Sequence, residues 1–237
     1  MKTRTSKPNN SRARVYSVRA FALVLALSLT AATSVSASAL EAVDTASSFQ
    51  VVVNKTRPLT PITYRPTDLV SVPKYNPYGR IVRKTVAKAL VQLGDAMKAD
   101  GQGTLIVQSG YRSYSSQTKI HDAKVRALGK IHGEKLAARP GYSEHQTGLA
   151  VDFAARGVST LTESFANTKA GIWLAANAYR FGFVLRYPRG KTSITGYSFE
   201  PWHFRYVGVE IATAMHDQNI ATLEEFNNLP AAPNYLN

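Results

Sequence analysis

The sequence contains no cysteine among its 237 residues. Disulfide bonds and thiolate metal sites are therefore both excluded, and any metal ion must be held by histidine, aspartate, glutamate and water. Acidic residues are also scarce, with 15 Asp and Glu against 29 Lys and Arg, so the formal net charge is +14. A positive net charge favours attraction to anionic partners but does not indicate the fold.

Long apolar runs are also rare. Residues 20–29 form one, but it is short for a membrane span of about 20 residues. A positive leader precedes this run and Ala37-Ser38-Ala39 follows it, which is the layout of a secretory signal peptide. We therefore expect residues 1–39 to be a cleaved signal peptide of an exported protein, extracellular or associated with the wall or membrane; an uncleaved N-terminal anchor is the alternative. Cleavage would remove six Lys or Arg and no acid, lowering the charge from +14 to +8.

The remaining chain divides into three parts. Residues 40–77 are rich in proline and predict a tether or wrapping arm with a short strand at 49–53, residues 78–216 predict the main domain, and residues 217–237 a C-terminal tail. Apolar spacing predicts helices at 80–99, 115–128 and 165–181, with short ones at 209–215 and 223–226. Strands are expected at 104–107, 149–153, 183–187 and within 197–207. This order indicates an α+β domain with a small antiparallel sheet flanked by helices.

The segment 141–153 carries two candidate metal ligands, His145 and Asp152. After Gly148, apolar residues alternate through Leu149, Val151 and Phe153, as in a half-buried strand, which places Asp152 on the opposite face. A divalent ion needs at least one further protein ligand.

His203 is the best candidate for that ligand, because it alternates with Trp202, Phe204 and Tyr206 and so turns away from the apolar face. The other three histidines have polar surroundings and are expected to be solvated or structurally hydrogen-bonded: His121, His132 and His216. Three ligands, His145, Asp152 and His203, leave a fourth position for water, which is the catalytic arrangement of zinc.

Glu200 and Arg112 complete a hydrolytic set. Glu200 would face away from His203 in a regular strand, but Pro201 marks a break that lets both side chains reach one cavity. A carboxylate beside the metal can take a proton from the bound water and pass it to a leaving amine. Arg112, just past the strand at 104–107, would stabilise the oxyanion.

Three motifs now stand together: Ser109-Gly110-Tyr111-Arg112-Ser113 with Gln117, the run from Ser143 to Asp152, and the run from Glu200 to Tyr206. With them, the chain resembles the D-alanyl-D-alanine carboxypeptidases of the VanY type, which belong to the zinc peptidases of lysostaphin-like and hedgehog-like folds. The resemblance covers about residues 51–215.

The resemblance implies one zinc ion on His145, Asp152 and His203, with Glu200 as general base and then acid. It also implies that Arg112 stabilises the transition state, and that Gln117 and Ser143 help to hold the substrate's terminal carboxylate. The implied reaction is attack of zinc-bound hydroxide on the last peptide bond of a peptidoglycan stem peptide, releasing D-alanine. We expect a monomer that also contacts anionic wall or membrane surfaces. An endopeptidase or D,D-dipeptidase of the same fold, or a non-catalytic wall-binding protein, are the alternatives.

Three other interpretations have less support. Ser116 and Lys119 match the Ser-x-x-Lys of penicillin-binding proteins, but the accompanying motifs are missing. A phosphate loop ending at Lys191 would need glycine where Leu185 stands. Nucleic acid is not expected as a partner, because no stacking motif or basic reading helix accompanies the positive charge.

Overall fold

The computed structural model describes residues 1, 3, 42–157 and 161–236. The predicted signal peptide at 1–39 therefore lies outside the described residues, apart from its positions 1 and 3. Among the residues described, no helix is both long and apolar enough to cross a membrane. The description that follows concerns residues 42–236, which belong to one structural unit.

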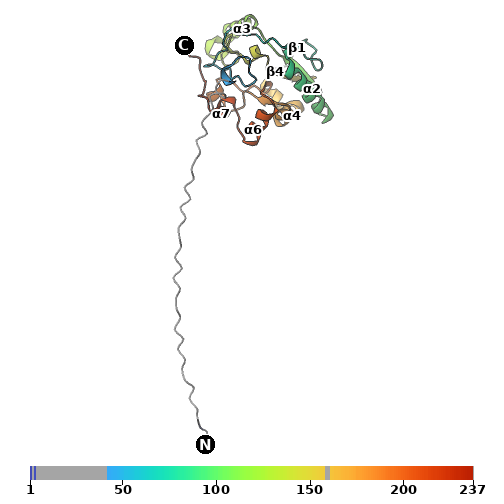
Figure 1. The fold of residues 1–237 in the computed structure, drawn as a ribbon, viewed down its shortest axis with the longest axis vertical. Coiled ribbons are helices and arrows are strands. Elements are labelled where there is room, and N and C mark those ends of the chain that lie inside the picture. Colours follow the sequence, from blue (N-terminus) through green and yellow to red (C-terminus); the bar gives the residue numbers. More distant parts are fainter. Residues whose placement is uncertain (2, 4–41, 158–160, 237) are drawn as a thin grey trace. The chain divides into compact units, whose positions relative to one another are not determined.

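A four-stranded antiparallel sheet occupies the centre of this unit (Figure 1). Its strands run in the order β3 (Leu105–Ser109), β4 (Ala150–Ala155), β6 (His203–Tyr206) and β5 (Phe183–Leu185). A separate two-stranded sheet pairs β1 (Leu69–Ser71) with β2 (Ile81–Arg83). The predicted α+β fold with a small antiparallel sheet is confirmed.

One face of the central sheet forms the hydrophobic core. Val151, Phe153 and Phe204 point into it, and helices α2 (Lys84–Ala99) and α4 (Lys169–Asn177) supply apolar side chains from the other side. Leu90 and Leu93 of α2 are fully buried, and each such side chain contributes about 1.5–3 kcal/mol on transfer from water. Asp152 lies on the opposite face of β4, as the alternation predicted.

The remaining elements surround the sheet. They are α3 (Tyr114–Gly133), α5 (Thr192–Thr195), α6 (Val209–Asp217) and α7 (Leu223–Phe226), with 3-10 helices η1 (Glu144–Thr147), η2 (Glu163–Asn167) and η3 (Ala178–Phe181). Helices α6 and α7 confirm the two short helices expected near the C-terminus. Helix α3 is capped by the Ser113 side chain and extends past the expected end at Gly129, where the backbone is non-helical.

Several expected boundaries were wrong. The helix expected from residue 80 begins at Lys84, because Ile81–Arg83 pairs with β1. The helix expected at 165–181 consists of η2, α4 and η3, and Ile172, expected on its apolar side, is 59% exposed. No regular strand forms at 49–53, although Val51 and Val53 pack into the core. Strand β4 is buried on both faces, where the alternation predicted one exposed face.

The chain on either side of residues 78–216 contributes to the same unit. Leu59 and Val72 of the proline-rich segment are buried in the core. The Arg205 guanidinium, on the polar side of β6, donates to the carbonyl oxygens of Phe49 and Val51, so that segment covers the polar face of the sheet. Near the C-terminus, Ala232 N–H donates to the carbonyl of Ile194.

Candidate active site

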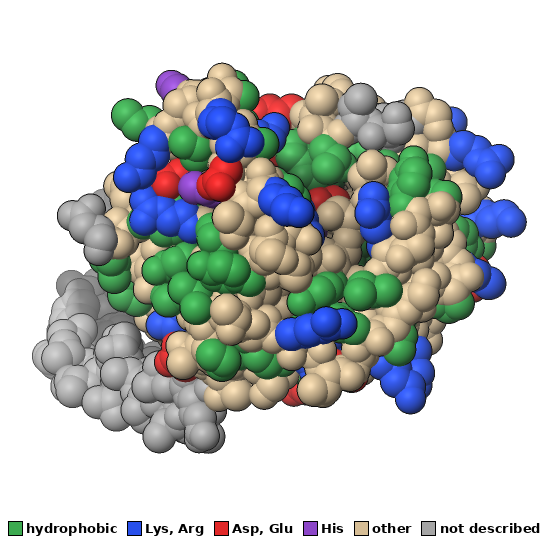
Figure 2. All heavy atoms as spheres, turned by 90° about the horizontal axis from the view of Figure 1, so that it is seen from above, with side chains coloured by type: hydrophobic (Ala, Val, Ile, Leu, Met, Phe, Trp, Pro, Cys, Tyr) green, Lys and Arg blue, Asp and Glu red, His purple; other side chains and the backbone are tan. Residues whose placement is uncertain are grey.

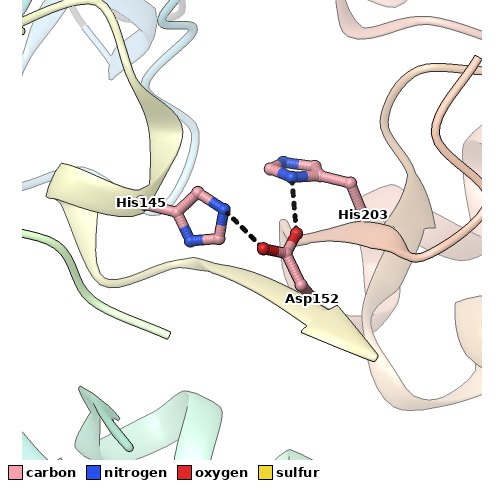
Figure 3. A group of neighbouring side chains, drawn as sticks. All are labelled: His145, Asp152 and His203. Carbon is pink, nitrogen blue, oxygen red and sulfur yellow. Dashed lines mark hydrogen bonds and ion pairs between the residues drawn. The ribbon is translucent and has the colours of Figure 1, made fainter. Parts of the chain in front are cut away.

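Two of the three predicted metal ligands are direct cross-strand neighbours. Asp152 of β4 pairs with His203 of β6 in an antiparallel register, so both side chains project from the same face. His145 comes from η1, which ends at Gly148 in a left-handed conformation (φ 67°) and leads the chain into β4. Candidate ligand atoms of the three residues all lie within 4.8 Å of one another (Figure 3).

Each imidazole has a defined orientation. His145 Nδ1 lies 2.7 Å from the carbonyl oxygen of Gly110, which can only accept, so His145 Nε2 faces Asp152 Oδ2 at 3.3 Å. His203 Nδ1 lies 3.0 Å from Asp152 Oδ1. The other ring nitrogen, His203 Nε2, is buried and has no hydrogen-bond partner among the described residues.

The electrostatics of the three side chains differ. Burial, assisted by the Arg112 charge, lowers the pKa of His145 to about 4. Burial also opposes charge on His203, but Asp152 and Glu144 outweigh it and raise its pKa to about 9. Burial likewise opposes ionisation of Asp152, yet the two histidines hold its pKa well below the ordinary value. Two imidazoles and an ionised carboxylate, converging in a buried position, fit the donor set of a catalytic zinc ion.

Glu200 lies beside this set, in the turn that precedes β6. Its N–H donates to the carbonyl of Tyr187, its own carbonyl accepts from His203 N–H, and its Oε2 lies 3.8 Å from His203 Nδ1. The break at Pro201 thus brings Glu200 and His203 to one cavity. Burial, reinforced by the Asp152 carboxylate, raises the pKa of Glu200 to about 8. A carboxyl group with a pKa near neutrality suits both acceptance and donation of a proton.

Arg112 lies on the other side of Asp152. Its Nη2 donates to Asp152 Oδ2 at 3.2 Å and its Nη1 to Gln117 Oε1 at 2.9 Å. The Arg112 backbone N–H donates to the carbonyl of His145. These contacts fix a permanent positive charge next to the candidate ligands.

A cavity of about 370 Å³ opens over these residues. All seven predicted site residues line it: Arg112, Gln117, Ser143, His145, Asp152, Glu200 and His203. The structure therefore gathers into one place side chains that are separated by up to ninety-one positions in the sequence.

The family model described as "VanY: D-alanyl-D-alanine carboxypeptidase" matches residues 79–209. The chain belongs to the VanY family. The resemblance predicted from the three motifs is thereby confirmed.

Curated relatives of this VanY-family chain include YodJ of Bacillus subtilis, assigned as a carboxypeptidase, which is 41% identical over 79% of this chain and 70% of its own. A D-alanyl-D-alanine carboxypeptidase of Enterococcus faecalis is 46% identical over 60% of this chain and 54% of that protein. This chain therefore spans about half the length of the enterococcal relative.

Solved structures show the same fold at similar identity. The LD-carboxypeptidase LdcB is 40% identical, with a TM-score of 0.71 over 77% of this chain and 87% of that one. A glutamate-to-alanine variant of the vancomycin-resistance D,D-pentapeptidase VanY, in complex with Zn(II), is 38% identical, with a TM-score of 0.64 over 75% and 97%. VanYB in complex with D-alanine-D-alanine is 40% identical, with a TM-score of 0.65 over 76% and 97%.

Gln117 and Ser143 occupy different positions in the VanY-family cavity. Both ends of the buried Gln117 amide are engaged, since Oε1 accepts from Arg112 and Nε2 donates to the carbonyl of Ala138 at 2.7 Å. Gln117 therefore holds Arg112 in place. Ser143 lines the cavity at the N-cap position of η1, and its hydroxyl makes no hydrogen bond within the part of the chain that is described.

A buried cluster of ion pairs lies behind the site, and it was not predicted from the sequence. Glu144 Oε1 accepts from Arg186 Nε and Arg205 Nη1, each at 2.8 Å, and Arg186 also forms a bidentate pair with Glu224 at 2.7 and 2.8 Å. All four side chains are fully buried. The only signal was the position of Glu144 next to His145, because its partners come from distant segments.

The residues of the rival serine motif lie elsewhere. Ser116 and Lys119 are exposed on the first turns of α3, and neither lines the cavity. The Ser116 hydroxyl accepts a hydrogen bond from Ser113 Oγ at 3.0 Å. This geometry gives no support to a serine nucleophile.

Proposed function

We propose that this chain is a zinc-dependent D,D-carboxypeptidase that removes the terminal D-alanine from peptidoglycan stem peptides. The observation that carries the proposal is the convergence of a His, Asp, His donor set with Glu200 and Arg112 in one cavity. The family match supports it, as do the Zn(II) complex of VanY and the D-alanine-D-alanine complex of VanYB.

His145, Asp152 and His203 would hold the zinc ion. When bound, zinc lowers the pKa of a coordinated water toward about 7 and polarises the substrate carbonyl. The carbonyl of Gly110 holds His145 with its Nε2 toward Asp152, so the His145 ring is oriented for metal binding by the protein itself.

Glu200 would move the proton of the reaction. In its ionised form it accepts a proton from the attacking water, whose oxygen adds to the carbonyl carbon of the last peptide bond. When the C–N bond breaks, the same carboxyl group donates that proton to the departing nitrogen of D-alanine. The raised pKa of Glu200, about 8, makes both transfers accessible near neutral pH.

Arg112 would serve the negative charges of the substrate. Its guanidinium lies against Asp152, and Gln117 keeps it in position, so it would stabilise the negative charge that develops on the carbonyl oxygen. The hydroxyl of Ser143, which also lines the cavity, would donate to the terminal carboxylate. A C-terminal carboxylate is thus the recognition group that this cavity suits.

Mass analysis of pentapeptide muropeptides tests the proposal. Incubation with the purified protein is expected to remove one alanine, chelator to abolish this, and added zinc to restore it. Loss of both alanines would assign a dipeptidase, and an internal cut an endopeptidase. Inhibition by a β-lactam together with indifference to chelator would overturn the metallopeptidase assignment.

An L,D-carboxypeptidase is a second candidate, because the fold also matches LdcB with a TM-score of 0.71. Such an enzyme would act on stems that end in a single D-alanine after an L-configured centre. Tetrapeptide and pentapeptide stems, offered in separate reactions and then in competition, distinguish the two. A kcat/KM at least tenfold higher for the tetrapeptide would favour the L,D assignment.

We also propose that the protein is exported and works as a monomer near anionic wall or membrane surfaces. The N-terminal sequence pattern and the basic charge support this, and Figure 2 shows Lys and Arg side chains spread over one face. N-terminal sequencing of protein from the culture medium and wall fraction tests cleavage near residue 39. Light scattering tests the oligomeric state, and retention of the full-length chain in the membrane would indicate an anchor.

A further inference from the structure

Two buried polar atoms behind the ligand set face each other. His203 Nε2 has no hydrogen-bond partner in the described part of the chain, and neither has Glu144 Oε2. They lie 3.6 Å apart, slightly beyond the range of an N–H···O hydrogen bond, and a small side-chain movement closes that gap. Because buried polar groups are rarely left unpaired, these two atoms are natural partners.

The Glu144 carboxylate is held so that this oxygen remains directed at His203. Its Oε1 is engaged by both Arg186 and Arg205 at 2.8 Å. Arg186 is itself fixed by Glu224, and Arg205 by the carbonyl oxygens of the proline-rich segment. Rotation of the carboxylate away from His203 would break two charge-assisted hydrogen bonds.

We propose that Glu144 is a positioning residue for His203. It accepts the Nε2–H and so favours the tautomer that carries its proton on Nε2 and presents an unprotonated Nδ1 to the metal site beside Asp152. The proposal rests on the metal site of the proposed function. A histidine that binds a metal usually donates its other ring N–H to a carboxylate or carbonyl. Gly110 fills this role for His145 through its backbone, and Glu144 fills it for His203 through a side chain.

The competing explanation is that Glu144 only neutralises the two arginines. The chain offers a matched control, because Glu224 is equally buried and also pairs with Arg186 but makes no contact with His203. Glu144→Gln and Glu224→Gln remove the same charge from the same cluster. Only Glu144→Gln places a side-chain amide N–H against His203 Nε2, which favours the opposite tautomer.

The experiment measures zinc affinity by competition with a chromogenic chelator, and the His203 tautomer by long-range ¹H–¹⁵N NMR of histidine-labelled protein. Glu144→Gln is expected to weaken zinc binding by about 10- to 100-fold and, in the zinc-loaded protein, to move the Nε2–H signal of His203 upfield, because the hydrogen bond to a carboxylate is lost. Glu224→Gln is expected to keep zinc affinity within about twofold of wild type and to leave the Nε2–H signal of zinc-loaded His203 in place, because Glu144 remains available as the hydrogen-bond acceptor.

Equal loss of zinc affinity in both variants, or wild-type affinity in Glu144→Gln, would overturn the proposal. If Glu144→Gln does not fold, the zinc-loaded wild type decides alone, because absence of a proton on His203 Nε2 would contradict it. None of these readouts depends on turnover. A wild-type protein that binds zinc but cleaves no muropeptide would therefore refute the proposed function and leave this inference to be judged separately.

Discussion

Among single residues, Arg112 makes the contacts that connect the candidate metal ligands with α3. The same guanidinium contacts Asp152 of the ligand set and Gln117 of α3, while the Arg112 backbone N–H donates to the carbonyl of His145. A planar group with several fixed donors makes such contacts simultaneously, and an ammonium does not.

Replacing Arg112 with lysine tests this role. Arg112→Lys keeps the charge but loses the fork that reaches Gln117 and Asp152, so kcat/KM for a D-Ala-D-Ala substrate is expected to fall by about 10²–10³. Arg126→Lys, at an exposed position of α3, serves as the control and should leave the rate unchanged. A loss of less than fivefold in Arg112→Lys would argue against charge stabilisation by this residue.

Glu200 gives the second residue-scale prediction. Glu200→Gln preserves the shape of the side chain but cannot exchange the proton, so turnover is expected to fall by about 10²–10⁴. Zinc content, measured by atomic emission, should stay at one ion per chain, because Glu200 is not a proposed ligand. Glu163→Gln, in an exposed pair with Arg189, is the control. Wild-type turnover in Glu200→Gln would refute the assigned role and favour a non-catalytic protein.

At the scale of secondary-structure elements, the packing of β2 against the end of β3 determines how precisely the candidate ligands are placed. Gly110 follows β3, and a Cβ there would lie 2.6 Å from the carbonyl oxygen of Ile81. The Gly110 carbonyl is also the acceptor that orients His145. The missing side chain of Gly110 therefore allows β2 to approach, and its carbonyl group orients a candidate ligand.

Gly110→Ala is expected to lower the free energy of unfolding by about 1–3 kcal/mol through backbone displacement, and to weaken zinc binding as well. Gly171→Ala is the matched control, because its Cβ would lie 2.0 Å from the carbonyl of Phe165. That clash is remote from the ligands, so only stability should fall. Denaturant unfolding and zinc competition separate the two effects. Unchanged zinc affinity in Gly110→Ala would show that His145 does not need this carbonyl.

The sequence predicted most elements and the strand faces that carry Asp152 and His203, because both follow from short-range periodicity. Alternation placed Asp152 and His203 each opposite the apolar face of its own strand, and the register of β4 and β6 puts the two side chains on the same face of the sheet. The break between η2 and α4 was missed because the apolar spacing continues across it. Thr168, whose side chain caps α4, was the local signal for that break.

Contacts between distant segments were beyond prediction. The partners of Glu144 are Arg186 and Arg205, which follow it by 42 and 61 positions, and no periodicity connects them. The same holds for Ile81–Arg83, whose helical spacing is overridden by pairing with β1. Tertiary pairing decides such cases, and a single sequence records it only indirectly.

At the scale of the whole molecule, the buried ionic cluster ties together η1, the segment after β5, strand β6 and helix α7. Burial would raise the pKa of Glu144, but Arg186 and Arg205 outweigh it and hold the pKa well below 4.5. A carboxyl group with a depressed pKa stabilises the folded state fully above its unfolded pKa, and this contribution is lost as the pH falls.

The stability cost of Glu144→Gln should therefore depend on pH. Removing one partner of a buried ion pair costs about 3–5 kcal/mol at neutral pH. The deficit relative to wild type is expected to shrink as the pH falls below about 4.5, because the wild-type carboxylate then loses its own advantage. Urea unfolding between pH 7 and pH 3 measures it. A deficit that stays constant over this range would contradict the assigned pKa shift.

Zinc would connect η1, β4 and β6, so its removal should loosen the whole unit. Chelation is expected to lower the melting temperature, and stoichiometric zinc to restore it, because a ligand that binds only the folded state stabilises it by mass action. Differential scanning calorimetry of the metal-free and zinc-loaded protein measures the shift, and an Asp152→Ala variant, which lacks a ligand, should show a much smaller one. An equal shift in that variant would place the metal elsewhere.

The cavity draws its candidate ligands from β4, β6 and η1, whereas part of its rim comes from α3, including Ile120 and Lys124. Ile120 and Lys124 are exposed and do not belong to the hydrophobic core. Mutation there can change which peptide is admitted at little cost to folding or to the metal site. A rim that is separate from the core and from the ligands can change in evolution without loss of the fold. Solved structures with this fold are accordingly described as an LD-carboxypeptidase and as a D,D-pentapeptidase.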